Sequence, residues 1–160
     1  MIRKTVVLLA LVALASFSFF GLEIATSNSL TARAAENAQL SPAAVEGDPH
    51  EFMEYVFEPT FKRLKLAMAS QPVDSSGWKT IKSDALILAE GGNLLLLRKP
   101  EMDAAKWVDH SIELRDVGGQ LYRAAKKKDF PASRKAYELM VTRCNTCHQQ
   151  FAEGEHQLEP

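Results

Sequence analysis

Hydrophobic and polar positions alternate along most of the chain with the period of an α-helix. From about residue 50 to residue 152, apolar side chains return every three or four positions, and charged residues occupy many of the positions between them. This spacing places the apolar side chains on one face of each helix. Alternating β-branched runs bounded by hairpin turns do not occur in the sequence, so strands are not expected. The pattern predicts an all-α fold.

Breaks in the pattern divide it into four helices. The expected helices cover about residues 50–70, 75–98, 104–128 and 129–152. Asp74 or the serines after it, Asp103 and Asp129 stand where the N-caps of the last three helices are needed. Pro59 lies inside the first helix and should kink or restart it, because proline has no amide proton and its ring clashes with the preceding turn. Four helices of roughly 15 to 25 residues joined by short turns predict an antiparallel up-down four-helix bundle.

Two glycine pairs, Gly91-Gly92 and Gly118-Gly119, interrupt the two middle helices. Glycines inside a helix indicate either a close approach to another helix or a local kink. A flat ligand that takes up core volume is a second interpretation, and the sequence does not separate the two.

The beginning of the chain has the layout of an export signal. Arg3 and Lys4 precede an apolar run at residues 6–22, and small residues provide a cleavage site after Ala34. That site lies far from the apolar run, and an uncleaved run would anchor the protein in a membrane. Because about 17 residues is the lower limit for spanning a bilayer, we favour cleavage. We therefore expect residues 1–34 to be a signal peptide and the protein to be periplasmic.

Composition fits a small exported domain. Cleavage would remove three of the 19 basic residues and one of the 20 acidic residues, so the mature protein is mildly acidic and no nucleic-acid partner is expected. Residues 35–49 lack an apolar period and are rich in small and acidic residues, which predicts a flexible lead-in. Residues 50–154 then form the helical domain, and residues 155–160 form a short tail.

Both cysteines of the chain lie in the stretch RCNTCHQQF near the C-terminus. Cys144, Cys147 and His148 are three and four positions apart on the last predicted helix, so their side chains project toward the same neighbour. C-x-x-C-H is the attachment signature of c-type haem, in which each thiol adds across a vinyl group and the adjacent imidazole reaches the iron. The motif predicts haem c held by two thioethers, with His148 as the proximal iron ligand.

Three other uses of the cysteine pair fit the sequence less well. A thioredoxin-type pair normally opens a helix after a strand, whereas this pair lies late in a helix of an all-α chain. A zinc site needs four ligands, and the remaining histidines, His50, His110 and His156, are scattered. A disulfide between positions i and i+3 of one helix has poor geometry and closes too small a loop to stabilise much. A free thiol pair also does not persist outside the cytosol, so the cysteines need an occupant.

With this motif on the last of four helices, the chain resembles the class II c-type cytochromes, the group of cytochrome c′ and cytochrome c556. The likeness covers about residues 50–152, and its specific part is CNTCH with Phe151 three places after the histidine. It implies a haem inside the bundle whose distal face looks onto the first helix. It also leaves open a homodimer formed through the first two helices. Many relatives have a basic residue after the phenylalanine, whereas this chain has Ala152, which puts a proximal cation in doubt.

The sixth iron position decides the function that the resemblance implies. Low-spin members place a methionine there, and five-coordinate members place an apolar or aromatic side chain. The first helix offers Met53 as the candidate ligand, although filling the core is the commoner use of a methionine in such a stripe. Met68 is a weaker candidate farther along the same helix, and His50 is an outside candidate.

The expected function is single-electron transfer between redox partner proteins. If Met53 does not bind the iron, a five-coordinate protein that binds NO or CO is the alternative. A helical module without haem, in which C-x-x-C-H is incidental, is the third hypothesis. No Ser/His/Asp arrangement, phosphate loop or paired-carboxylate site is recognisable, so we do not expect an enzyme.

Overall fold

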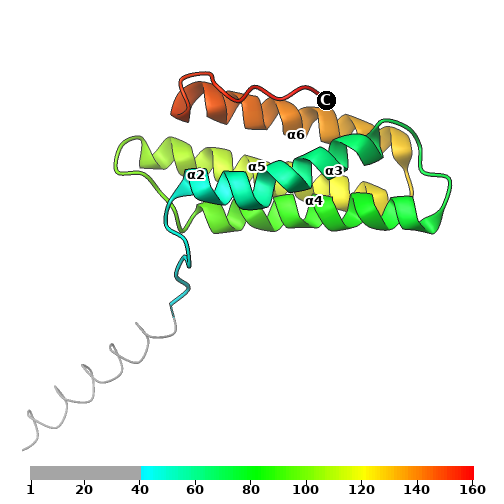
Figure 1. Cartoon of the computed structure of the whole chain (residues 1–160), viewed down its shortest axis with the longest axis horizontal. Coiled ribbons are helices and arrows are strands. Elements are labelled where there is room, and N and C mark those ends of the chain that lie inside the picture. The colour runs from blue at the N-terminus through cyan, green and yellow to red at the C-terminus, as the bar shows by residue number, and fades with distance from the viewer. Residues whose placement is uncertain (1–40) are drawn as a thin grey trace, which may run out of the picture. The chain divides into compact units, whose positions relative to one another are not determined.

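The computed structural model describes residues 41–160, and every regular element within this range is helical (Figure 1). The elements are α2 (Pro49–Phe52), the π-helical turn η1 (Met53–Phe57), α3 (Glu58–Met68), α4 (Ser75–Leu95), α5 (Ala104–Lys126) and α6 (Phe130–Phe151). Because α2, η1 and α3 follow one another without a break, they form the first of four long helical segments. The prediction of an all-α fold is confirmed.

The predicted export signal at residues 1–34 and its cleavage site lie outside the described residues. The described part of the expected lead-in is residues 41–49, of which residues 41–48 have no regular secondary structure, whereas Pro49 is already the first residue of α2. Residues 43–160 form one compact unit. Within the described range, none of the helices combines the length and the apolar character needed to cross a membrane.

Aspartates stand at the start of all four helical segments. Three of them accept a hydrogen bond from a backbone N–H two or three residues later: Asp48 from His50 at 2.8 Å, Asp74 from Gly77 at 2.8 Å and Asp129 from Ala132 at 3.0 Å. These bonds satisfy amide groups that the first turn of a helix leaves unpaired. Asp103 precedes α5 as predicted but makes no such bond. Its φ of 56° turns the backbone into the left-handed region, and its carboxylate lies 3.3 Å from Lys106 Nζ instead.

Pro59 changes the first helical segment in the way its position predicts. Its ring cannot follow a regular α-helical turn, and it has no N–H to donate. The five residues of η1 open into a π-helical turn, in which the Glu58 N–H donates to the carbonyl of Met53. Turns of this kind are frequent at functional sites. In this chain the π-helical turn begins at Met53, the candidate sixth ligand.

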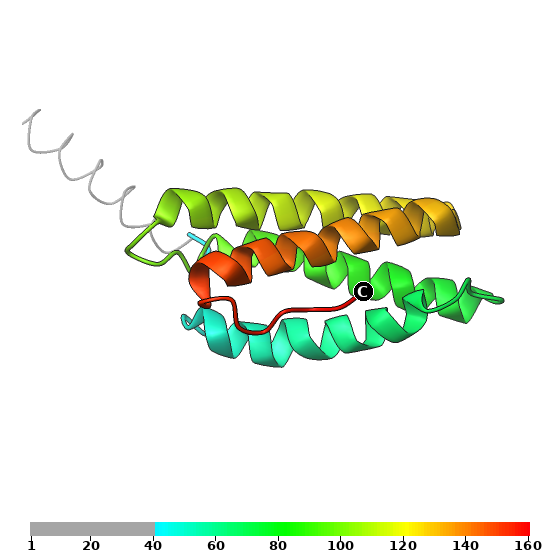
Figure 2. The same cartoon turned by 90° about the horizontal axis from the view of Figure 1, so that it is seen from above.

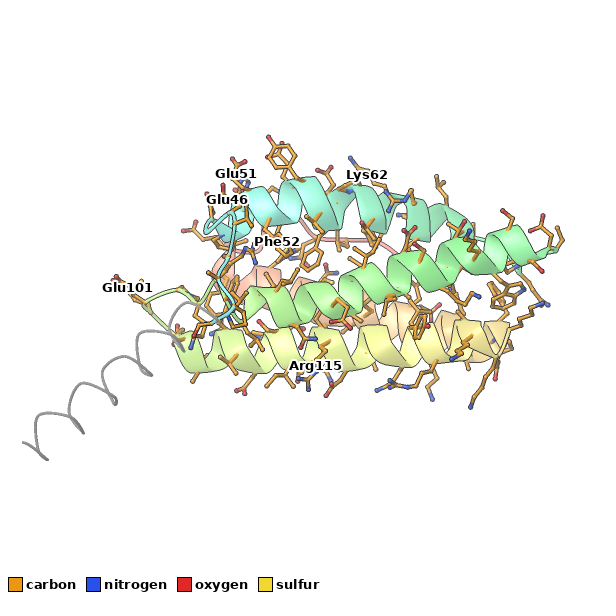
Figure 3. All side chains as sticks on the ribbon, turned by 90° about the horizontal axis from the view of Figure 1, so that it is seen from below. Glu46, Glu51, Phe52, Lys62, Glu101 and Arg115 are labelled. Carbon is orange, nitrogen blue, oxygen red and sulfur yellow. The ribbon has the colours of Figure 1, made fainter. Side chains whose placement is uncertain are left out.

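The first helical segment is amphipathic. Figure 3 shows Phe52 directed toward the interior, while Lys62 points away from it. Phe52 is buried, and the Arg98 guanidinium lies over its ring at 3.9 Å from the centroid. A cation over an aromatic face adds an electrostatic attraction to this packing. This contact joins the beginning of the first segment to the residues just after the end of α4.

The four helical segments pack in the order of the chain. α3 lies against α4, α4 against α5, and α5 against α6, as Figures 1 and 2 show. Their facing sides bury a core whose largest fully buried apolar members are Leu64, Met68, Ile81, Leu121, Tyr137 and Met140. α3 and α6 approach each other less closely than these consecutive pairs. Room for a cavity therefore remains between the first and last helical segments.

Glycines let α4 and α5 touch at two points. A Cβ added to Gly92 would lie 2.7 Å from the Ser111 carbonyl oxygen and 2.8 Å from the Arg115 backbone nitrogen. One added to Gly118 would lie 3.0 Å from the Ala89 Cα. A Cβ does not fit at Gly92 without a shift of the α5 backbone, and at Gly118 the neighbouring atoms would have to give by a few tenths of an ångström, so the close-approach interpretation is confirmed for both glycines.

Candidate functional site

A cavity of about 550 Å³ lies between α6 and the first helical segment. One wall comes from α2, η1 and α3, and the other comes from α6 and the C-terminal tail, which runs between these elements in Figure 2. Leu88 of α4 and Trp107 and Leu114 of α5 complete the lining. Most of the lining side chains are apolar or aromatic. Small-molecule and cofactor sites typically have this character and a volume of about 300–1,000 Å³.

All three motif residues line this cavity. Cys144, Cys147 and His148 lie on the last turns of α6, and each is partly buried. Positions three and four apart on a helix share a face, which explains why all three side chains reach the same space. Both cysteines are free thiols. The structure thus places two thiols and an imidazole together on one wall.

The two thiols are held in their protonated form. Burial, with a smaller contribution from the neighbouring Cys147, raises the pKa of Cys144 to about 12. Burial also raises the pKa of Cys147 to about 11. Catalytic dithiols depend on the opposite effect, a thiolate stabilised by a lowered pKa. The surroundings of this pair therefore do not favour a thioredoxin-type redox role.

The ring of His148 is held by a hydrogen bond from one of its two nitrogens. Its Nδ1 lies 2.9 Å from the carbonyl oxygen of His156. A carbonyl only accepts hydrogen bonds, so Nδ1 carries the proton and Nε2 keeps its lone pair. Burial lowers the pKa of His148, which favours the neutral imidazole that a metal ion requires. Metal-binding histidines commonly make this bond from the second ring nitrogen.

Met53 lies on the opposite wall of the cavity. It is half-buried and belongs to η1, so the first helical segment carries it and α6 carries His148. Met68 is fully buried and does not line the cavity. Met140 lines the cavity, but it shares α6 with His148. Among the methionines within residues 41–160, Met53 is therefore the one that lines the cavity from a helix other than α6.

Polar side chains of the first segment, including His50 and Glu54, also line the cavity. His50 lines the cavity, and its ring centroid lies 6.4 Å from that of His156. The ligand atoms of His50, Glu51 and Glu54 lie within 4.8 Å of one another. Exposed groups of this composition are also common in proteins without a bound metal ion, and His50 and Glu54 are exposed here. We assign this group no role in the site.

Phe151 fixes the end of α6 against α5. Its ring meets that of Trp107 edge-on, with centroids 5.1 Å apart and an interplanar angle of 89°. The Trp107 Nε1 in turn donates to the Leu95 carbonyl at 2.8 Å, which satisfies its one polar atom. His110 Nε2 lies 3.1 Å from Gln150 Oε1, next to Phe151. These contacts hold the cavity wall that follows the motif.

The C-terminal tail contributes part of the site that sequence reasoning missed. His156, Gln157 and Leu158 line the cavity, although the sequence marked residues 155–160 only as a tail. Asn145, between the two cysteines, binds the tail through two hydrogen bonds to Leu158. Gly154 was the one available signal, because glycine just after a helix often reverses the chain.

Comparison with known proteins gave no match to a protein-family model and no significant match to a curated protein. The function of the chain is therefore inferred from the cavity residues and their geometry.

Proposed function

We propose that the chain is a c-type cytochrome, in which Cys144 and Cys147 hold haem c covalently and His148 is the proximal ligand of its iron. The observation that carries this proposal is that both thiols and an imidazole with a free Nε2 face one apolar cavity of about 550 Å³. When bound, the haem supplies an iron that takes up and releases a single electron.

The surroundings of the thiols suit their proposed role. Each thiol adds its sulfur and its hydrogen across one vinyl double bond, which forms a C–S and a C–H bond without net oxidation. After this addition neither sulfur has a proton to lose. The two residues then tether the porphyrin, and the apolar lining of the cavity keeps water away from it.

We further propose that the protein is a class II c-type cytochrome, an antiparallel up-down four-helix bundle with haem attached to its last helix. Two features support this arrangement. Consecutive helical segments pack against each other in chain order, and the cavity lies between the first and last segments. A bundle whose cofactor site lies among facing helices is a common use of this architecture.

Within this class we propose an electron carrier with Met53 as the sixth iron ligand. Met53 lines the cavity from the first helical segment, whereas His148 lines it from α6. A thioether opposite an imidazole raises the reduction potential of a haem. The protein would then exchange electrons with redox partner proteins and would not act as an enzyme.

A five-coordinate protein that binds NO or CO is the second candidate. It is favoured by Phe57 and Phe61, which line the same wall as Met53 and would leave an apolar space beside the iron if Met53 did not bind. An absorption spectrum separates the candidates. Sharp Soret and α bands in the reduced state support the electron carrier, and broad high-spin bands that shift with CO support gas binding. A spectrum without a Soret band contradicts both.

The proposed location is the periplasm after cleavage of residues 1–34, and an uncleaved segment would tie the protein to the membrane. A homodimer is compatible with the surface of the first helical segment and α4. These segments carry several exposed large apolar side chains: Tyr55, Leu66, Leu86, Ile87 and Leu94.

A further inference from the structure

The chain reverses direction directly after α6. Residues 153–158, which we call the proximal strap, run back beside α6 (Figure 2). Glu153, Gly154 and His156 have φ values of 52°, 81° and 56°, in the left-handed region. Glycine adopts this region freely, but the other two residues do so at an energetic cost. Specific contacts must therefore hold the strap in this conformation.

Asn145 provides two of these contacts. Its Nδ2 donates to the Leu158 carbonyl at 2.9 Å, and the Leu158 N–H donates to its Oδ1 at 2.8 Å. One amide side chain thus pairs with both polar groups of one backbone residue, as a neighbouring strand would. Leu158 also packs against the hydrophobic core. The residue that anchors the strap lies inside the C-x-x-C-H motif itself.

The end of α6 joins the strap to the proposed iron ligand. The N–H groups of Ala152 and Gly154 both donate to the His148 carbonyl, at 2.9 Å and 3.1 Å. The His156 carbonyl accepts from His148 Nδ1 at 2.9 Å. The backbone and the ring of His148 are therefore both bound by residues just after the helix.

We propose that the proximal strap is a positioning device for His148. It holds the imidazole in the tautomer with Nε2 free, and its residues 156–158 close one side of the cavity. This inference rests on the proposed role of His148 as the iron ligand. A hydrogen bond from Nδ1 to a carbonyl also makes the imidazole a stronger donor to a metal. Asn145 acts on the iron only through this chain of contacts.

The first test uses Asn145→Ala, which removes both bonds to Leu158. Thr146→Ala is the matched control, because Thr146 is the other variable residue of the motif and its hydroxyl bonds only the Thr142 carbonyl. Asn145→Asp keeps an acceptor for the Leu158 N–H but no donor for the carbonyl. We expect hydrogen exchange of the Leu158 amide to become about tenfold faster or more in Asn145→Ala, less so in Asn145→Asp, and to stay unchanged in Thr146→Ala.

The second test reads the imidazole itself. In reduced, haem-loaded protein carrying Met53→Ala, so that only His148 occupies the iron, resonance Raman spectroscopy gives the iron–histidine stretching frequency. Adding Asn145→Ala should shift this frequency down, and adding Thr146→Ala should not. A chain that ends at Glu155 loses the His156 carbonyl without any change in α6, and it should show the same downward shift. This shortened chain also provides the test if the Asn145→Ala variant does not fold.

The outcomes separate this inference from the proposed function. If Asn145→Ala speeds exchange of the Leu158 amide but leaves the iron–histidine stretching frequency unchanged, the strap does not position His148. If exchange of the Leu158 amide is also unchanged, Asn145 does not anchor the strap. If mass spectrometry shows no haem, the proposed function fails, and the strap is then read in the haem-free chain from the ¹⁵N shifts of the His148 ring. Those shifts should show the Nδ1–H tautomer in the unmodified chain and a mixture of tautomers in the chain ending at Glu155. A mixture in both chains contradicts the strap.

Discussion

Among single residues, Met53 is the proposed sixth ligand of the iron, and it lines the cavity from the first helical segment. The helical stripe of the first segment marked both Met53 and Met68, and only the structure shows that Met53 faces the cavity while Met68 is buried in the core. The difference follows from tertiary packing, because both methionines satisfy the same helical spacing. Met53 is also the first residue of the π-helical turn. Pro59 was the sequence feature that predicted an interruption of the helix here.

Replacing Met53 tests its proposed place at the iron. Met53→Ala should convert a low-spin absorption spectrum into a high-spin one, lower the reduction potential and allow CO to bind to the reduced protein. Met102→Ala is the control, because Met102 is 82% exposed in the loop before α5. A low-spin spectrum that survives Met53→Ala unchanged would show that another residue occupies the sixth position.

The thiols predict an unusual pH dependence in the haem-free chain. With the pKa of Cys144 at about 12 and that of Cys147 at about 11, iodoacetamide labelling at pH 8 should be slower than for an ordinary thiol by roughly a hundredfold at Cys147 and roughly a thousandfold at Cys144, and faster above pH 10. Both pKa values are raised by folding, so this contribution to stability is complete below the ordinary thiol pKa and is lost as pH rises through 11 and 12. Equal labelling of the folded and urea-unfolded chains at pH 8 would contradict the described burial.

At the scale of the helices, most boundaries were accessible from the sequence because their signals are local. Asp74 and Asp129 cap helices through side-chain bonds that need only the following turn. Asp103 also stands at a helix start, but the absence of a capping bond from its side chain could not be predicted, because it depends on the φ of 56° that Asp103 adopts after the preceding loop. The glycine pairs indicated a close approach without identifying the partner helix. That information depends on how α4 and α5 pack.

The glycine contacts make a prediction with an internal control. Gly92→Ala should lower the free energy of unfolding by about 1–3 kcal/mol, because the new methyl group would meet backbone atoms of α5. At Gly119 an added Cβ would meet only the mobile end of Arg123, at 3.1 Å. Gly119→Ala should therefore be neutral or stabilising by up to about 1 kcal/mol, since alanine favours a helix. Urea unfolding of both variants measures this difference, and equal effects would contradict the described contact between α4 and α5.

At the scale of the whole molecule, the site consists of the motif, the opposite wall and the proximal strap. Only the first of these could be predicted from the sequence alone. The motif predicted that Cys144, Cys147 and His148 share a face, because helical spacing alone decides this. The residues of the opposite wall could not be predicted in the same way, because they depend on how the first segment lies relative to α6. The proximal strap was not predictable, since it depends on Asn145 meeting Leu158, 13 residues away, through a turn of left-handed residues. The sequence of the strap is polar and has no periodicity from which its conformation could be predicted.

The central claim is that this cavity holds a covalently bound haem, and the mass of the mature protein tests it most directly. The protein should be produced with its export segment in a host that can couple haem to C-x-x-C-H sequences, and then purified from the periplasm. We predict a mass equal to the processed polypeptide plus one haem, and a variant with both Cys144→Ala and Cys147→Ala should have the mass of the polypeptide alone. If exported protein with both cysteines intact has the mass of the bare polypeptide, the account is contradicted.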